Sequence, residues 1–363
     1  RWLNMPDAGN AEDPLEPLSA EELWVTDTGQ VISSLGGETG QSINARLMRE
    51  MAPARPAPAP DRAARSAFIE QRRARVLKRL GLKLAAEREP AAVRQVGEYP
   101  HQRLVIEKLA IASEPGIELP ALFIAPKQGT RGPVFVHAAE LGKPQEPDES
   151  ALPFRLALAG CRVLSVDVRG MGELDIERGK RTQVSEYDPI HWRRDSLAIS
   201  STGGGRTMLG QRAFDLVRCV DYLRSREDTA EAPLVLVGER LGGSWCLVAA
   251  VADERVSAVA TVGTLASYRL IIDNKWNNLR EYFWVPGALA DYDLCDLPAL
   301  IAPRPVALIN TVDQMLHVME TDAVQEEYSW AAKYYEVAGA GGHLRIVSPA
   351  ADDDVVAAIC DLP

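Results

Sequence analysis

The chain has 363 residues, of which 46% are hydrophobic and 6% aromatic, a composition typical of a globular protein with one large core. Its 51 acidic residues outnumber its 40 basic residues, and the resulting net charge of −11 argues against nucleic acid or an anionic membrane surface as a partner. No apolar run approaches the roughly 18 to 20 residues that span a bilayer, so we expect no membrane segment.

The first sixty residues are predicted to form an N-terminal extension (1–60) that precedes the main domain (61–363). The chain begins at Arg1 without an initiator Met or the apolar region of a signal peptide, and we therefore expect a processed or excised end. Residues 24–32 predict a short hairpin around a glycine turn. The Pro- and Ala-rich run 51–60 predicts an extended linker.

From about residue 100, short apolar segments alternate with helix-like segments, which is typical of a mostly parallel sheet with helices on both faces. The sequence predicts about eight strands, of which the first two form an antiparallel edge hairpin. The expected strands are 104–111, 119–125, 134–137, 162–168, 234–238, 258–262, 306–310 and 333–337. The expected helices are 61–81, 151–158, 210–225, 242–252, 322–332 and 352–360.

Two long insertions, at about 174–207 and 266–302, interrupt this alternation. Connections of this length in a compact domain are usually lids or binding surfaces. The second insertion contains Tyr282 and Trp284, which are therefore candidate substrate-binding residues. The alternative is that these aromatic side chains pack the insertion onto the core.

Residues 234–243 combine a short apolar strand, a glycine-flanked turn and the start of a helix, which is the layout of a G-x-S-x-G nucleophile elbow. Arg240 stands at the serine position. Because a guanidinium is always protonated and cannot attack a carbonyl, ordinary serine ester chemistry is excluded at this turn. Arg240 beside a helix N-terminus makes the turn a candidate site for an anion or a carboxylate-bearing ligand. The alternative is a salt bridge with Glu239 or Asp313 that fills the pocket.

An elbow of this kind works with an acid after a later strand and a histidine after the last strand. Asp313 follows the expected strand 306–310, and His343 lies in a glycine-rich loop after the expected strand 333–337. We therefore expect Asp313 and His343 in the acid and base positions, with the imidazole directed at the elbow.

Two backbone N–H groups are the expected oxyanion donors. They belong to Leu241, at the start of the elbow helix, and to Ala138, after the third expected strand. Ser244 and Cys246 lie deeper in the same helix, so we expect neither to replace the missing serine.

The 5 histidines are widely spaced, and no metal-binding motif or phosphate-binding loop is present. We therefore expect neither a metal nor another cofactor. The 5 cysteines are dispersed without a C-x-x-C pair, and we expect them to be structural.

From about residue 104 onward, the chain resembles bacterial α/β-hydrolases of the acetyl xylan esterase-like or dienelactone hydrolase-like group. The resemblance rests on residues 134–137, the D-x-R-G-x-G run 167–172, the elbow 238–243, the A-P-R-P run 302–305 and Gly342-His343. It implies an α/β-hydrolase fold and deacetylation of sugar esters by a serine, an acid and a histidine. The residues leave the compartment open, and the resemblance favours a secreted or periplasmic protein.

Two hypotheses of function follow. The first is a carbohydrate-esterase-like module with weak or no serine esterase activity, because Arg240 replaces the nucleophile. The second is a noncatalytic module that binds a saccharide or an adjacent hydrolase domain, since the residues before 61 resemble the tail of a preceding module in a tandem hydrolase.

Overall fold

The computed structural model describes residues 14–52, 54–84, 89–128, 132–175, 189–279 and 285–362, with the backbone alone for residues 189–195. The chain divides into two compact units, Arg1–Leu47 and Met48–Pro363. The expected boundary at residue 60 lies within the second unit.

The first unit contains short helices where the sequence predicted a hairpin. The helices are α1 (Ala20–Leu23), α2 (Val31–Leu35) and the start of α3 (Gly40–Met51). Residues 25–29 form turns and bends, in which the Gly29 N–H donates to the Thr26 carbonyl at 3.1 Å. The hairpin prediction is therefore wrong, because the chain continues into a helix directly after this turn.

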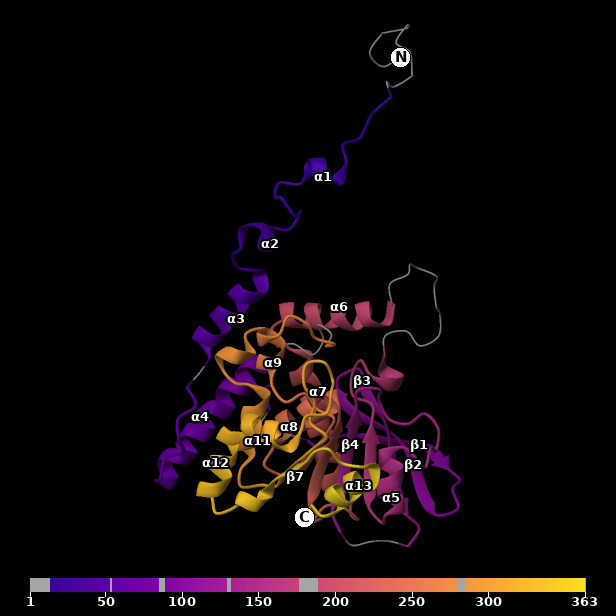
Figure 1. Cartoon of the computed structure of the whole chain (residues 1–363). Helices are drawn as coiled ribbons and strands as arrows, with labels where there is room; N and C mark the ends of the chain where they lie inside the picture. Colours follow the sequence, from indigo (N-terminus) through magenta and orange to yellow (C-terminus); the bar gives the residue numbers. More distant parts are fainter. Residues whose placement is uncertain are drawn as a thin grey trace. The chain divides into compact units, whose positions relative to one another are not determined.

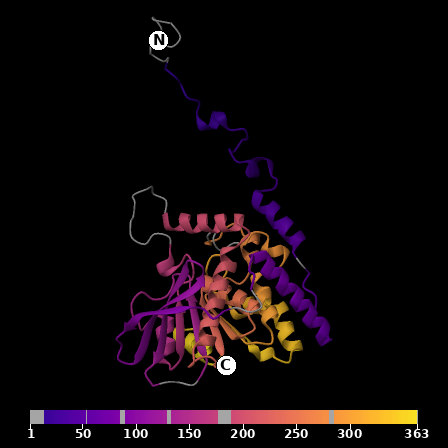
Figure 2. The ribbon, with the colours of Figure 1, turned by 180° about the vertical axis from the view of Figure 1, so that it is seen from behind.

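The second unit is built on a sheet that has nine strands in the described part of the chain, in the order β1-β2-β3-β5-β4-β6-β7-β8-β9. Strands β4 to β9 run parallel to one another, whereas β1, β2 and β3 are antiparallel and lie at one edge (Figure 2). This architecture confirms the predicted mostly parallel α/β sheet. The strands are β1 (Val93–Tyr99), β2 (Leu104–Glu114), β3 (Ile117–Pro126), β4 (Val134–Ala139), β5 (Arg162–Val166), β6 (Leu234–Glu239), β7 (Val256–Val262), β8 (Val306–Ile309) and β9 (Leu344–Val347).

One expected strand is a helix. Residues 333–337 belong to α12 (Ser329–Val337), in which Trp330, Ala331, Tyr334 and Tyr335 are buried at helical spacing. The last strand is instead β9, which begins at Leu344, after the end of α12. The sequence did not indicate the edge strand β1 either, because most of its side chains are exposed.

Alternate residues of the central strands pack into two separate cores. Val136 and Leu236 contribute to the first core, while Phe135, Val235 and Val237 contribute to the second. The helices of the first core include α4 (Arg62–Leu80), α7 (Met208–Ser225), α8 (Leu241–Ala252) and α10 (Leu297–Ile301). The second core contains the neighbouring helices α5 (Leu152–Leu158) and α13 (Asp352–Cys360) (Figure 1). The predicted helical cover on both faces of the sheet is thus confirmed.

The two predicted insertions contain secondary structure of their own. The first includes α6 (Pro189–Gly203), and the second includes α9 (Tyr268–Asp273) and α10. Helix α11 (Thr321–Glu327) directly precedes α12. Across the described ranges, none of the helices combines the length and the apolar character that crossing a bilayer requires.

Candidate functional site

Arg240 occupies the apex of a strained turn between β6 and α8. Its φ of 52° and ψ of −116° lie in a region that residues other than glycine rarely adopt. The Arg240 N–H donates to the Val262 carbonyl at 2.7 Å, and the Arg240 carbonyl accepts from the Thr264 hydroxyl at 2.9 Å. These two bonds hold the backbone of the apex from the neighbouring strand β7 and the turn after it.

The glycine before the apex is required by close packing. A Cβ atom on Gly238 would lie 2.3 Å from the carbonyl carbon of Gly242, so no larger residue fits between the end of β6 and the first turn of α8. The backbone therefore has the geometry of a nucleophile elbow although the side chain at its apex is not a nucleophile.

A cleft of about 810 Å³ lies at the carboxyl ends of β4, β6, β7 and β8, and Arg240 is part of its lining. This volume is in the range of small-molecule binding sites, and the carboxyl ends of parallel strands are where such sites form. The walls are completed by the loop after β4 and by the first turns of α5 and α13. Its ionisable side chains, as far as they are described, are the acids Glu140, Glu146, Asp148, Glu239 and Asp352 and the bases His137, Lys143, Arg155 and Arg240.

The Arg240 side chain is exposed in this cleft. Its guanidinium forms no hydrogen bond or ion pair with any residue that the structure describes. The alternative of a salt bridge to Glu239 or Asp313 is not realised, because Glu239 bonds to His137 and Asp313 accepts backbone N–H groups. A permanent positive charge is thus presented to the cleft.

Behind Arg240, a buried imidazole connects two side chains of the sheet. Nε2 of His137 lies 2.7 Å from Oε1 of Glu239, and Nδ1 of His137 lies 2.9 Å from Oγ of Ser165. Ser165 is fully buried, so this Ser-His-Glu chain cannot deliver its hydroxyl to a substrate. Burial raises the pKa of Glu239, but the hydrogen bond from His137 and the charges of His137 and Arg240 outweigh burial and keep that pKa below its ordinary value.

His343 lies at the wrong edge of the sheet for the expected role. It ends the short helical turn Gly341–His343 and directly precedes β9, and its Nδ1 lies 2.7 Å from the Pro303 carbonyl. Because β9 is parallel to β6, His343 is at the amino ends of the strands, whereas the elbow follows the carboxyl end of β6. A strand of four residues separates these edges by roughly 13 Å. The predicted placement of His343 after the last strand is therefore wrong.

The loop that does follow the last strand contains no histidine. Residues 348–351 are Ser-Pro-Ala-Ala, and Asp352 then begins α13. In the fold that the elbow defines, this loop carries the catalytic base. Neither the serine position nor the loop after β9 therefore provides the expected catalytic group.

Asp313 is placed after β8, as predicted, and its carboxylate closes a turn. Oδ1 accepts the N–H groups of Met315 at 2.8 Å and His317 at 2.9 Å, and Oδ2 lies 3.6 Å from Nδ1 of the exposed His317. The structure does not bring Asp313 together with His343. The role of Asp313 as an acid remains a prediction.

Among the side chains that the structure describes, neither the elbow helix nor the lining of the cleft offers a replacement for the serine. The Ser244 hydroxyl donates to the Leu241 carbonyl inside α8 at 2.7 Å, and Cys246 is fully buried, which raises the pKa of its thiol. Among the described lining residues, Ser150 has the one hydroxyl, and it donates to Asp148 at 2.6 Å. A serine that bonds to a carboxylate, with no imidazole described beside it, is a weak nucleophile.

The two expected oxyanion donors occupy different backbone contexts. Leu241 is the first residue of α8, so its N–H has no partner within the helix and belongs to the positive end of the helix dipole. Ala138 is paired with Gly238 in the β4–β6 ladder, and Glu140 and Leu141 are the first residues beyond that ladder. The oxyanion roles of Leu241 and Ala138 remain predictions.

Tyr282 and Trp284, the expected substrate-binding residues, lie outside the described part of the chain. Among the residues that are described, no three His, Cys, Asp or Glu side chains are grouped so that they could hold a metal ion.

The motifs that carry the family resemblance hold the framework of the site. Oδ1 of Asp167 accepts the Lys143 N–H at 2.6 Å and Oδ2 accepts the Glu173 N–H at 2.9 Å, which ties together the loops after β4 and β5. Arg304 donates to the carbonyl oxygens of Ala250 and Val256 at 2.7 and 2.8 Å and thereby fixes the end of α8. Asp167 thus connects two loops and Arg304 holds the C-terminal end of α8, and neither residue lines the cleft.

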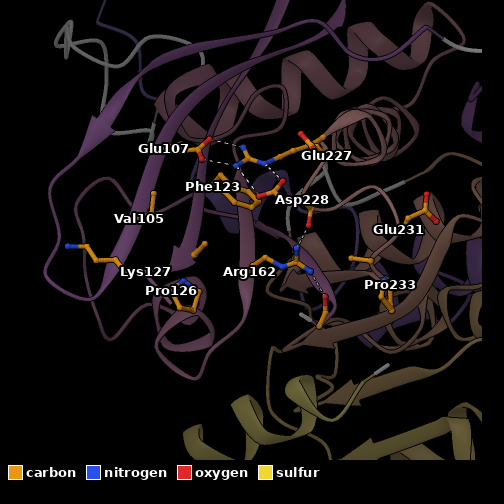
Figure 3. A pocket seen from close by; sticks show the side chains of 14 residues that line it. Val105, Glu107, Phe123, Pro126, Lys127, Arg162, Glu227, Asp228, Glu231 and Pro233 are labelled. Atoms are coloured by element: carbon orange, nitrogen blue, oxygen red, sulfur yellow. Dashed lines mark hydrogen bonds and ion pairs between the residues drawn. The ribbon is translucent and has the colours of Figure 1, made fainter. Parts of the chain in front are cut away.

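A second hollow, of about 770 Å³, lies near the amino ends of β4, β5 and β6 (Figure 3). Arg226 binds both carboxylate oxygens of Glu107 at 2.7 Å, and its guanidinium carbon lies 4.0 Å from the centre of the Phe123 ring. Nε of Arg226 also donates to Asp228 at 2.6 Å. Since the charge of Arg226 is neutralised by these acids, we assign this hollow a structural role.

No family model matches the chain. It is 24% identical over 288 residues to a protein of Bacillus subtilis (strain 168) that bears the name "Putative hydrolase YtaP", and the match covers 73% of this chain and 87% of that protein.

Two solved structures extend this comparison. One is described as a "putative acetyl xylan esterase" from Bacteroides fragilis, with a TM-score of 0.69, 14% identity and coverage of 88% of this chain and 84% of that one. The other is a glucuronoyl esterase from Solibacter usitatus, with a TM-score of 0.52, 16% identity and coverage of 79% and 87%. The chain thus has the α/β-hydrolase fold that is found in carbohydrate esterases.

Proposed function

We propose that this protein is a carbohydrate-esterase-like module that binds a saccharide carrying a carboxylate and has little or no esterase turnover. The observation that carries the proposal is the exposed guanidinium of Arg240 at the apex of an intact elbow. The charge lies where an esterase would hold the reacting acyl group, so the ligand's carboxylate would occupy that position.

The electrostatics of the apex favour an anion. A guanidinium offers two parallel N–H donors that match the two oxygens of a carboxylate, and charge-assisted bonds of this type are roughly twice as strong as neutral ones. The N-terminus of the 12-residue helix α8 adds a positive potential at the same turn. The neighbouring Glu239 is already bound to His137, which limits its competition for Arg240.

The remaining lining supports a ligand rich in hydroxyl groups. The acids of the cleft, which include Glu146, Asp148 and Asp352, can accept hydrogen bonds from sugar hydroxyls. Because acids outnumber bases along this lining, a ligand with one carboxylate and many hydroxyls fits better than a polyanion.

The absence of turnover follows from the two altered positions. Arg240 replaces the nucleophile, and residues 348–351 supply no imidazole to activate water. Losing triad members of an acyl-transfer enzyme removes several orders of magnitude in rate and leaves a residual contribution from the oxyanion hole and binding.

Isothermal titration calorimetry with a matched pair of ligands tests the proposal. The pair is a xylo-oligosaccharide with a single glucuronate and the same compound with its carboxylate methyl-esterified. We expect the acid to bind at least about 10-fold more tightly than the ester, since the ester cannot form the charged pair with Arg240. Methanol release from the ester, followed by NMR, should not exceed that in buffer.

The variant Arg240→Gln should lose about 10-fold in affinity for the acid and retain its affinity for the ester. Arg94→Gln is the control, because it removes an exposed arginine on β1 that pairs with Glu118 and does not line the cleft. Equal affinity for acid and ester, or unchanged affinity in Arg240→Gln, would overturn the proposal.

A further inference from the structure

Two cysteines that are 199 positions apart in the sequence meet at one edge of the second core. Sγ of Cys161 lies 3.3 Å from Sγ of Cys360, and neither residue takes part in a disulfide. Cys161 precedes β5, and its N–H donates to the Leu156 carbonyl at 3.0 Å, whereas Cys360 is the last residue of α13. The backbone of both residues is therefore held by regular structure.

These two thiols differ from the other three cysteines in their access to solvent. Cys219, Cys246 and Cys295 are buried, whereas Cys161 and Cys360 are partly exposed. A reagent in solution can thus reach this pair while the protein stays folded.

Helix α13 is attached to the second core by buried side chains along its length. Val355, Ala358 and Ile359 are buried in the second core. At the other end of the helix, Arg155 reaches Asp353 at 3.0 Å, but that carboxylate is fully exposed, and exposed ion pairs contribute little. A covalent bond at Cys360 would therefore add a fixed attachment at the C-terminal end of the helix.

We propose that Cys161 and Cys360 form an oxidation site that closes to an intramolecular disulfide and fastens α13 to the start of β5. The sulfur atoms need to approach by about 1.2 Å to reach a disulfide bond length, which small side-chain rotations supply.

The disulfide between Cys161 and Cys360 forms by thiol–disulfide exchange with a small-molecule disulfide such as oxidised glutathione. The two sulfur atoms lie within hydrogen-bond distance and both residues are partly exposed, so Cys360 can act as the first nucleophile. Its thiolate attacks the glutathione disulfide and releases one glutathione thiolate. The Cys161 thiolate then attacks the mixed disulfide and releases the second. Both protein thiols lose their protons, and the two electrons reduce oxidised glutathione to two molecules of glutathione.

Peptide mapping by mass spectrometry under non-reducing conditions tests this inference on the full chain after incubation with oxidised glutathione. We expect a linked pair of peptides that contain Cys161 and Cys360, with the loss of two hydrogen atoms. The midpoint of thermal unfolding should rise by roughly 3 °C and return on treatment with dithiothreitol.

Cys161→Ser and Cys360→Ser are matched controls, since each leaves one partly exposed thiol. Each variant should retain a glutathione adduct on the remaining cysteine and show no rise in its unfolding midpoint. Glutathione adducts without a linked peptide in the wild type would overturn the proposal, as would two thiols that remain free. A rise in the midpoint that persists in Cys360→Ser would do the same.

Discussion

A Cβ atom on Gly242 would lie 2.0 Å from the carbonyl oxygen of Ala138. The first turn of α8 therefore lies so close to the end of β4 that only glycine fits at position 242. This approach places the positive end of the helix dipole next to the end of β4 and directly after Arg240, which lines the cleft. The elbow thus keeps its packing although its apex carries Arg240.

We predict that Gly242→Ala destabilises the protein by about 3 kcal/mol or more, because the added methyl group meets backbone atoms that cannot rotate away. Urea denaturation followed by circular dichroism measures the change. Gly342→Ala is the control, since a Cβ atom there meets nothing within 4 Å, and it should change the free energy of unfolding by less than about 0.5 kcal/mol. Equal stability of the two variants would contradict the packing argument.

The pair of Glu239 and His137 predicts a pH dependence of stability. Because the folded protein keeps the pKa of Glu239 below its ordinary value, the ionised carboxylate stabilises the fold above about pH 4.3, and this contribution is lost as the pH falls through the folded pKa. In Glu239→Gln the free energy of unfolding should therefore fall less steeply between about pH 6 and pH 3. Denaturant midpoints across this range provide the measurement.

Glu118→Gln serves as the control for this pH series, because Glu118 is an exposed glutamate on β3 that pairs with Arg94 on β1. Its denaturation profile should follow that of the wild type. If Glu239→Gln also follows the wild type, the hydrogen bond to His137 does not stabilise the ionised carboxylate.

We predict that a buried ion pair contributes more to the free energy of unfolding than an exposed one. Asp215 is fully buried and binds Nε and Nη2 of Arg169 at 2.9 and 2.5 Å. Asp215→Ala leaves the Arg169 charge without this partner and should cost about 3 to 5 kcal/mol. Asp353→Ala removes an exposed partner of Arg155 and should cost less than about 1 kcal/mol. Similar losses in the free energy of unfolding for both variants would contradict this ranking.

The elbow could be predicted from the sequence because its signal is local. An apolar strand, a turn flanked by Gly238 and Gly242, and an apolar helix follow one another within one short segment. The alternation of apolar segments likewise predicted the parallel sheet and most of its strands. Neither inference depends on contacts between distant parts of the chain.

The placement of His343 could not be predicted, because it depended on one ambiguous segment. Residues 333–337 are Lys-Tyr-Tyr-Glu-Val, a run of five residues that is too short for periodicity alone to separate a buried helix from a strand. In the structure this segment is part of a helix that buries Tyr334 and Tyr335. The actual last strand, β9, begins directly after His343. The His343 imidazole is consequently at the amino ends of the strands, whereas the prediction placed it at their carboxyl ends.

The sequence also did not predict that Cys161 contacts Cys360 or that Glu239 bonds to His137. Cys360 is 199 residues from Cys161, and His137 is 102 residues from Glu239. Only the sheet order and the return of α13 bring these pairs together. Polar residues at the carboxyl ends of neighbouring parallel strands, such as His137 and Glu239, were the available signal for the second pair.

The rate of p-nitrophenyl acetate hydrolysis by the wild type, Arg240→Ser and His343→Ala tests the central claim most directly. Because the loop after β9 supplies no imidazole and His343 lies at the far edge of the sheet, all three proteins should show equally low rates close to that of buffer. Saturable hydrolysis by the wild type that His343→Ala reduces by about 100-fold or more would contradict the account, since His343 would then act as a catalytic base.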